Sequence, residues 1–250
     1  MKNYLEKEYS VLAAYVDRHC EMGPFQASLL FQDNMTEFFY QFGCDAVNMS
    51  RTHGAVWAVV RSKLCYERLP FWMEPIRTRT YPVKVTPVSI HIECLVQSGA
   101  GETLLRCRQE LCPIDAESHT MRRMNTTPFP LDMELPPSVV PEPFRRRKAE
   151  LGPEDLAYTT TIRTTDTDMN NHMNNVAYTR LVADAFPSAF WDKHQIKTFD
   201  IHYVSEGREG EELHILKREE DGEHIVFVQS GERTLIKSFL QVQPRQTFRG

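Results

Sequence analysis

The spacing of apolar residues near the start of the chain predicts a strand followed by a helix. Residues 9–16 are apolar enough to form the strand, and Pro24 is suited to the first turn of a helix. From there, apolar side chains recur at intervals of three and four residues, as on the buried face of a helix. This stripe consists of Phe31, Met35, Phe38 and Phe42. Gly43 is suited to end the helix.

The segment after this helix predicts a loop and then four strands. Residues 48–54 are expected to form the loop. The ranges that follow are rich in Val, Ile, Thr and aromatic residues, and turn residues separate them. The predicted strands are residues 55–67, 76–86, 88–97 and 103–114.

A proline-rich segment then separates this pattern from a second one. Residues 116–155 contain seven prolines and a basic run, which predicts an extended connector and a domain boundary. Beyond it, residues 158–163 alternate as a strand, and one helical face and four more strands follow. The helical face consists of Tyr178, Leu181, Val182 and Ala185, with Pro187 after it, and the strands are residues 198–204, 212–217, 225–229 and 234–242.

The two halves of the chain have the same order of predicted elements, with the helices offset by about 150 residues. Repetition on this scale predicts a duplicated domain rather than a solenoid. Each half joins one long helix to an antiparallel sheet, which is an α+β architecture. We expect an amino-terminal domain in residues 1–125, a linker in 126–155 and a carboxy-terminal domain in 156–250.

Composition and charge narrow the class of protein. The chain has 250 residues, of which 41% are hydrophobic and 25% charged, as in ordinary soluble proteins. A net charge of -5 and a pI near 6.0 argue against nucleic-acid binding. Charges interrupt residues 1–8, and no apolar run approaches the roughly 20 residues of a membrane span, so we expect a cytoplasmic protein. The six cysteines form no Cys-x-x-Cys pair, and we expect reduced thiols.

The polar stretch from Asp166 to Asn174 carries the candidate chemistry. It lies directly before the second helix, whose N-terminus offers unpaired N–H groups and a partial positive charge that can hold an oxyanion. With a carboxylate, an amide and an imidazole at Asp168, Asn170 and His172, this pattern indicates a hydrolytic site. Taken singly, such side chains are more typical of helix caps and local hydrogen bonds.

Three other sites can be set aside on their chemistry. Asp166, Asp168 and Asn170 resemble the start of an EF-hand loop, but its sixth position is Asn171 and its twelfth is Ala177, where glycine and glutamate are required. The chain has no Gly-x-Ser-x-Gly elbow of a serine hydrolase and no His-Glu-x-x-His of a metalloprotease.

A family resemblance rests on this stretch and on the duplicated pattern around it. The second half carries Asp168, Asn170, His172, Asn174, Asn175 and Tyr178 at the start of its helix. The first half carries Trp57, Pro70 and Trp72. This arrangement resembles the acyl-acyl-carrier-protein thioesterases. The resemblance implies two tandem hotdog units, each a curved antiparallel sheet around one long helix, and hydrolysis of acyl-carrier-protein thioesters to free fatty acid in fatty-acid biosynthesis, without metal or organic cofactor.

The resemblance also implies a site in which a carboxylate activates water. Glu206 follows His172 by about 34 residues, where the family places a catalytic carboxylate, and it is our candidate general base. Asn170 would orient the water or the thioester, His172 would tune Glu206, and Asp168 would hold His172 in one tautomer. The first N–H groups of the helix would form the oxyanion hole. Plant members have a cysteine after the glutamate, but this chain has Gly207, which favours attack by water.

The remaining site predictions concern substrate binding. Asn174 and Asn175 are expected to contact the substrate at the start of the helix. In the resembled family the amino-terminal half holds the acyl-chain pocket, which would place Phe38 and Trp57 against the acyl chain, although a packed core is the simpler interpretation of this stripe. The amino-terminal half has only Asp17 and His19 as analogues of the polar motif, and we expect both to be structural.

The partner implied by the resemblance is an acyl carrier protein, with a homodimer possible. The basic residues at 122, 123 and 145–148 are more typical of solvated linker charges, with electrostatic steering of such an acidic partner as the alternative. Two other functions stay open: an acyl-coenzyme A thioesterase, and a non-catalytic acyl-binding protein that keeps a hotdog core.

Overall fold

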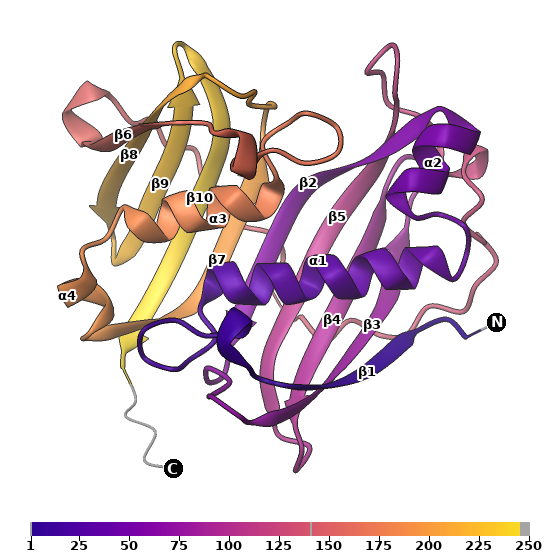
Figure 1. Cartoon of the computed structure of the whole chain (residues 1–250), viewed down its shortest axis with the longest axis horizontal. Coiled ribbons are helices and arrows are strands. Elements are labelled where there is room, and N and C mark those ends of the chain that lie inside the picture. Colours follow the sequence, from indigo (N-terminus) through magenta and orange to yellow (C-terminus); the bar gives the residue numbers. More distant parts are fainter. Residues whose placement is uncertain (1, 141, 246–250) are drawn as a thin grey trace. The chain divides into compact units, whose positions relative to one another are not determined.

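The computed structural model describes residues 2–140 and 142–245 of the chain (Figure 1). It divides into two compact units, Met1–Pro143 and Phe144–Gly250. The division falls inside the segment predicted as a linker. The finer limits 1–125, 126–155 and 156–250 stay a prediction.

The first unit is a five-stranded antiparallel sheet with helices against it. Its strand order is β1-β3-β4-β5-β2, and Figure 1 shows α1 running across the face of this sheet. Its elements are β1 (Leu5–Ser10), α1 (Pro24–Tyr40), α2 (Ala46–His53), β2 (Ala55–Tyr66), β3 (Pro75–Val85), β4 (Ile90–Ser98) and β5 (Thr103–Asp115). Pro24 is the first residue of α1, as its fixed φ angle favours.

The second unit repeats this plan with a shorter helix. Its strand order is β7-β10-β9-β8-β6, and α3 lies across this sheet in Figure 1. Its elements are β6 (Leu156–Thr161), α3 (Asn175–Asp184), α4 (Ser188–Trp191), β7 (His194–Tyr203), β8 (Glu212–Glu220), β9 (Glu223–Ser230) and β10 (Arg233–Pro244). The α+β class and the antiparallel sheets are therefore as predicted.

Two local predictions were wrong. The first strand was expected at residues 9–16, but β1 ends at Ser10, and Ala13–Tyr15 forms a 3-10 turn. Alternation in β1 is hidden from the sequence because its half-buried positions include the charged Lys7 between Leu5 and Tyr9. Residues 48–54 were expected to be a loop, but most of them lie in α2. This helix buries only Met49, so it has almost no apolar stripe to recognise.

The core of the first unit is aromatic. Phe38 and Phe39 of α1 are buried with Phe129, and the three rings contact one another at centroid distances of 5.8 to 6.3 Å. Trp57 stacks on Phe39 with centroids 4.8 Å apart, and its Nε1–H donates to the Cys44 carbonyl oxygen at 2.8 Å. This cluster fixes α1 on the sheet through its apolar stripe.

The proline-rich connector is bound to the sheets rather than loose. In the first unit, the fully buried Glu93 carboxylate accepts hydrogen bonds from Arg108 Nε at 2.7 Å, Ser138 Oγ at 2.6 Å and Val139 N–H at 2.7 Å. In the second unit, Ala149 and Leu151 pack on the cluster formed by Leu216, Ile225, Phe227 and Phe239. The connector is therefore held by hydrogen bonds to a buried carboxylate in the first unit and by apolar packing in the second.

The basic run in this connector is partly neutralised. Arg145 Nε lies 3.0 Å from Glu223 Oε1, and Arg147 Nη1 lies 3.1 Å from Glu223 Oε2. Arg122 likewise pairs with Asp115 at 2.6 Å. None of the helices within the described residues is long and apolar enough to cross a membrane.

Candidate active site

The polar stretch forms a tight loop between β6 and α3. The Asp168 N–H donates to the His172 carbonyl oxygen at 2.9 Å, and the Asn171 N–H donates to the Asp168 carbonyl oxygen at 3.0 Å. The Asp168 carboxylate accepts the Asn170 N–H at 2.8 Å. Asn171 takes the left-handed backbone conformation, with φ of 59°, which asparagine tolerates better than most residues. These bonds fix where Asn170 and His172 project from the loop.

Asn174 caps helix α3. Its side-chain oxygen accepts the Val176 N–H at 2.8 Å, and its own N–H donates to the Asp166 carbonyl oxygen at 2.8 Å. The Ala177 N–H donates to the Asn174 carbonyl oxygen at 2.9 Å. The Asn175 N–H has no acceptor among the described residues. Of the first N–H groups of α3, which were predicted to form the oxyanion hole, only the Asn175 N–H is therefore still open to a ligand among the described residues.

Glu206 and His172 meet, although they lie far apart in the sequence. Glu206 follows strand β7, and its Oε2 lies 3.1 Å from His172 Nε2. The His172 side chain is 17% exposed and that of Glu206 is 55% exposed. A carboxylate held by a mostly buried imidazole, with one side still open to water, has the arrangement that a general base needs.

The backbone around Glu206 is held on both sides. Arg233, the first residue of β10, donates from Nη1 to the Glu206 carbonyl oxygen at 3.1 Å and pairs through Nη2 with Glu211 at 2.7 Å. The Met173 N–H donates to the Gly207 carbonyl oxygen at 2.8 Å, which ties this segment to the His172 loop. Arg233 was not among the predicted site residues, because a contact from a neighbouring hairpin leaves no periodic signal in the sequence.

Gly207 leaves no room for a side chain. A Cβ atom there would lie 2.7 Å from Ile162 Cδ1, 2.8 Å from Tyr178 Oη and 3.0 Å from Leu235 Cδ1. Burial raises the pKa of Tyr178, whose hydroxyl therefore stays protonated at neutral pH. The tight fit accounts physically for glycine at this position, and a cysteine here would force its neighbours apart.

Two of the predicted site side chains make fewer contacts than expected. The Asn170 side chain is exposed and has no hydrogen bond to the described residues, so its amide is open to a ligand. The Asp168 carboxylate bonds to the Asn170 backbone, and within the described part of the chain it makes no hydrogen bond to the His172 ring. The structure thus brings His172 and Glu206 together but does not join Asp168 to the imidazole.

The predicted acyl-chain residues lie in the first unit. Phe38 is fully buried, and Trp57 is half-buried and stacked on Phe39. Both belong to the aromatic core described above, and their contact with an acyl chain stays a prediction.

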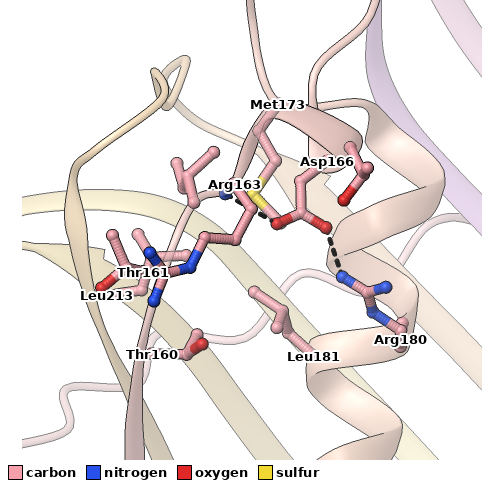
Figure 2. A pocket seen from close by; sticks show the side chains of 10 residues that line it. Thr160, Thr161, Arg163, Asp166, Met173, Arg180, Leu181 and Leu213 are labelled. Atoms are coloured by element: carbon pink, nitrogen blue, oxygen red, sulfur yellow. Dashed lines mark hydrogen bonds and ion pairs between the residues drawn. The ribbon is translucent and has the colours of Figure 1, made fainter.

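A cavity of about 220 Å³ lies beside the loop (Figure 2). Met173 of the loop, Leu181 of α3 and Leu213 of β8 line it together with polar residues. In Figure 2 the Asp166 carboxylate meets Arg180 of α3, and it also accepts the Arg163 N–H at 2.9 Å. Asp166, which is buried, therefore anchors the start of the loop to the helix. No group of three or more His, Cys, Asp or Glu side chains in the described part of the chain could hold a metal ion.

The fold is shared with solved thioesterase structures. It superposes on an acyl-acyl-carrier-protein thioesterase from Bacteroides thetaiotaomicron with a TM-score of 0.86 and 16% identity, covering 96% of this chain and 98% of that one. The 12:0-acyl-carrier-protein thioesterase from Umbellularia californica gives a TM-score of 0.82 and 16% identity, covering 98% and 99%. This chain therefore has the fold of these two structures.

Sequence comparison finds similarity to the acyl-acyl-carrier-protein thioesterases. Residues 152–240 match the model of the acyl-ACP thioesterase C-terminal domain. A chloroplastic dodecanoyl-[acyl-carrier-protein] hydrolase from Cinnamomum camphora is 23% identical over 214 residues, which are 78% of this chain and 55% of the relative. The chain spans about half the length of the curated relatives it matches. This match lies in the carboxy-terminal unit and bears out the resemblance carried by its motif.

Proposed function

We propose that this protein hydrolyses the thioester of acyl-acyl-carrier protein and releases free fatty acid in fatty-acid biosynthesis. The observation that carries the proposal is the 3.1 Å contact between His172 Nε2 and Glu206 Oε2, beside the capped N-terminus of α3. It occurs within the stretch that matches the acyl-ACP thioesterase C-terminal domain, and the Cinnamomum camphora relative is named as a hydrolase of this substrate class.

In the proposed reaction, Glu206 takes a proton from a water molecule while the water oxygen attacks the thioester carbonyl carbon. His172 donates from Nε2–H to the Glu206 carboxylate and fixes its orientation. The Asn170 amide, which is open to a ligand, orients the water or the thioester. The C–S bond then breaks, and protonated Glu206 returns the proton to the departing thiolate. The products are a fatty acid and the free thiol of the carrier.

The N-terminus of α3 stabilises the tetrahedral oxyanion in this scheme. The Asn175 N–H is open, and the partial positive charge of the helix end adds to it. Asn174 supports this geometry as the helix cap. Water is the attacking group in this scheme because Gly207 carries no nucleophile.

The proposal includes the finer architecture and the binding of the acyl chain. The two units would be tandem hotdog domains, with the acyl chain received near Phe38 and Trp57 of the first. Both units show the same order of strands and helices, which supports the duplication. A homodimer, a cytoplasmic location and a reaction without metal or organic cofactor stay predictions.

The experiment that tests this proposal replaces the general base. Glu206→Gln keeps the size and one hydrogen-bond acceptor but cannot take a proton, so we expect kcat on acyl-acyl-carrier protein to fall on the order of 100- to 10,000-fold. Release of carrier thiol measures the rate, and circular dichroism checks that the variant is folded. Near-normal turnover by the folded variant would remove Glu206 from the mechanism.

A second candidate, an acyl-coenzyme A thioesterase, is favoured by the ion pairs of the connector. Arg122, Arg145 and Arg147 already pair with carboxylates, so less positive charge is open to an acidic carrier protein. Hydrolysis of the same acyl group on either carrier, measured at low and high salt, decides between them. A clear preference for coenzyme A would reject the carrier-protein proposal. Binding of acyl chains without release of thiol would instead identify a non-catalytic protein.

A further inference from the structure

The loop before α1 has the same backbone hydrogen bonds as the site loop before α3. The Asp17 N–H donates to the Glu21 carbonyl oxygen at 2.8 Å, as the Asp168 N–H does to that of His172 at 2.9 Å. The Cys20 N–H donates to the Asp17 carbonyl oxygen at 3.1 Å, and Cys20 has φ of 60°, matching Asn171 at 59°. The two loops therefore have one geometry, each within its own unit.

The aspartate has the same task in both loops. The Asp17 carboxylate accepts the His19 N–H at 2.8 Å, and the Asp168 carboxylate accepts the Asn170 N–H at 2.8 Å. In both cases the acceptor closes a turn over the residue two positions on. Helix α1 then begins seven residues after Asp17, and α3 begins seven residues after Asp168.

Each loop is also tied to the segment after a long strand. The Met22 N–H donates to the Pro70 carbonyl oxygen at 2.8 Å, as the Met173 N–H does to that of Gly207. The residue before Pro70 is Leu69, which is 8% exposed, whereas the residue before Gly207 is Glu206. The first unit therefore keeps the aspartate-built loop but has an apolar side chain where the second has the carboxylate.

We propose that Asp168 is a positioning residue, whose carboxylate builds the turn that presents Asn170 and His172, and that it does not set the His172 tautomer. The first unit provides the comparison: it keeps the same aspartate and the same hydrogen bond although Glu21 stands where His172 does and Leu69 where Glu206 does. The hydrogen bond that the two loops share requires only an oxygen acceptor, and the Asp17 carboxylate also accepts the Glu21 N–H at 3.3 Å. The proposal rests on the proposed function for its kinetic readout only.

The test compares two replacements at Asp168 with one at Asp17. Asp168→Ala removes the acceptor, so we expect kcat to fall on the order of 100-fold as Asn170 and His172 lose their placement. Asp168→Asn keeps an oxygen acceptor without the charge, and it should recover most of that loss with the pH profile of kcat unmoved. Asp17→Asn is the matched control and should leave kcat as in the native chain.

A readout independent of turnover is the nitrogen chemical shifts of the His172 ring. We expect Asp168→Asn to keep the native tautomer. A changed tautomer, a shifted pH profile, or a loss as large as that of Asp168→Ala would overturn the proposal, because each would mean that the charge of Asp168 acts on the imidazole. Retention of native kcat by Asp168→Ala would overturn it as well. Failure of the proposed function would appear elsewhere, as an active Glu206→Gln variant.

Discussion

At the scale of single residues, the candidate site depends on the Glu206 side chain and on what holds its backbone in place. Glu206 is more than half exposed, so its own packing does little to place it. Its position comes from His172 at the carboxylate, Arg233 at the carbonyl oxygen and the Met173–Gly207 hydrogen bond next to it. Removing any one of these should affect turnover more than stability.

Arg233 offers the cleanest prediction at this scale. Arg233→Gln shortens the side chain and removes both the hydrogen bond to the Glu206 carbonyl oxygen and the pair with Glu211, so we expect kcat to fall about 10-fold as Glu206 shifts. Arg208→Gln is the matched control, since Arg208 is exposed and its side chain has no partner among the described residues. Equal kinetics for the two variants would show that the Arg233 contact is not needed.

At the scale of elements, short helices escaped the sequence pattern because they bury little. Helix α2 is defined by its cap, in which the Asp45 carboxylate accepts the N–H groups of Val47 and Asn48 at 3.1 Å. Helix α4 is held by aromatic contacts, in which Phe190 lies 4.5 Å from His194 and 5.2 Å from His224 between ring centroids. Capping and side-chain clusters of this kind carry no 3.6-residue repeat.

The cluster at α4 predicts a pH dependence of stability. Burial lowers the pKa of His224 below its usual value, with Lys217 and His194 acting in the same direction and Glu219 opposing them. On acidification the unfolded chain therefore binds the proton first, and the free energy of unfolding falls as pH drops through about 6.5. His224→Gln should flatten this slope in urea titrations between about pH 7 and pH 5.5. An unchanged slope would contradict the assignment to His224.

At the scale of the whole molecule, the connector is part of each fold rather than a spacer. Glu93 is fully buried and joins Arg108 of β5 to Ser138 and Val139 of the connector. In the second unit, the backbone N–H of Arg145 donates to the Asp200 carboxylate at 2.9 Å. Composition alone indicated an extended connector, because prolines and arginines are typical of linkers and the acidic partners lie far away in sequence.

Removing the buried carboxylate should release this segment. Glu93→Ala leaves Arg108 without its partner and the Val139 N–H without an acceptor, which we expect to cost about 3–5 kcal/mol in the free energy of unfolding. Limited proteolysis should then cut the connector faster than in the native chain. Glu117→Gln, on an exposed turn, is the control. Native stability and native cleavage rates in Glu93→Ala would refute the role of this carboxylate.

The local patterns of this chain were sufficient to predict most of its antiparallel strands, the main helix of each half and the polar loop before α3. Each of these features is set by residues that are close together in the sequence. Examples are the apolar stripe of α1 and the caps and turns between Asp168 and Asn174. Only the tertiary structure decided that Glu206 meets His172, that Arg233 holds the Glu206 backbone, and that Asp168 bonds to the Asn170 N–H and not to the imidazole. The first two are contacts between segments that are distant along the chain. The Asp168 carboxylate could accept a hydrogen bond either from the Asn170 N–H or from the His172 ring, and the turn of the folded loop places it at the Asn170 N–H.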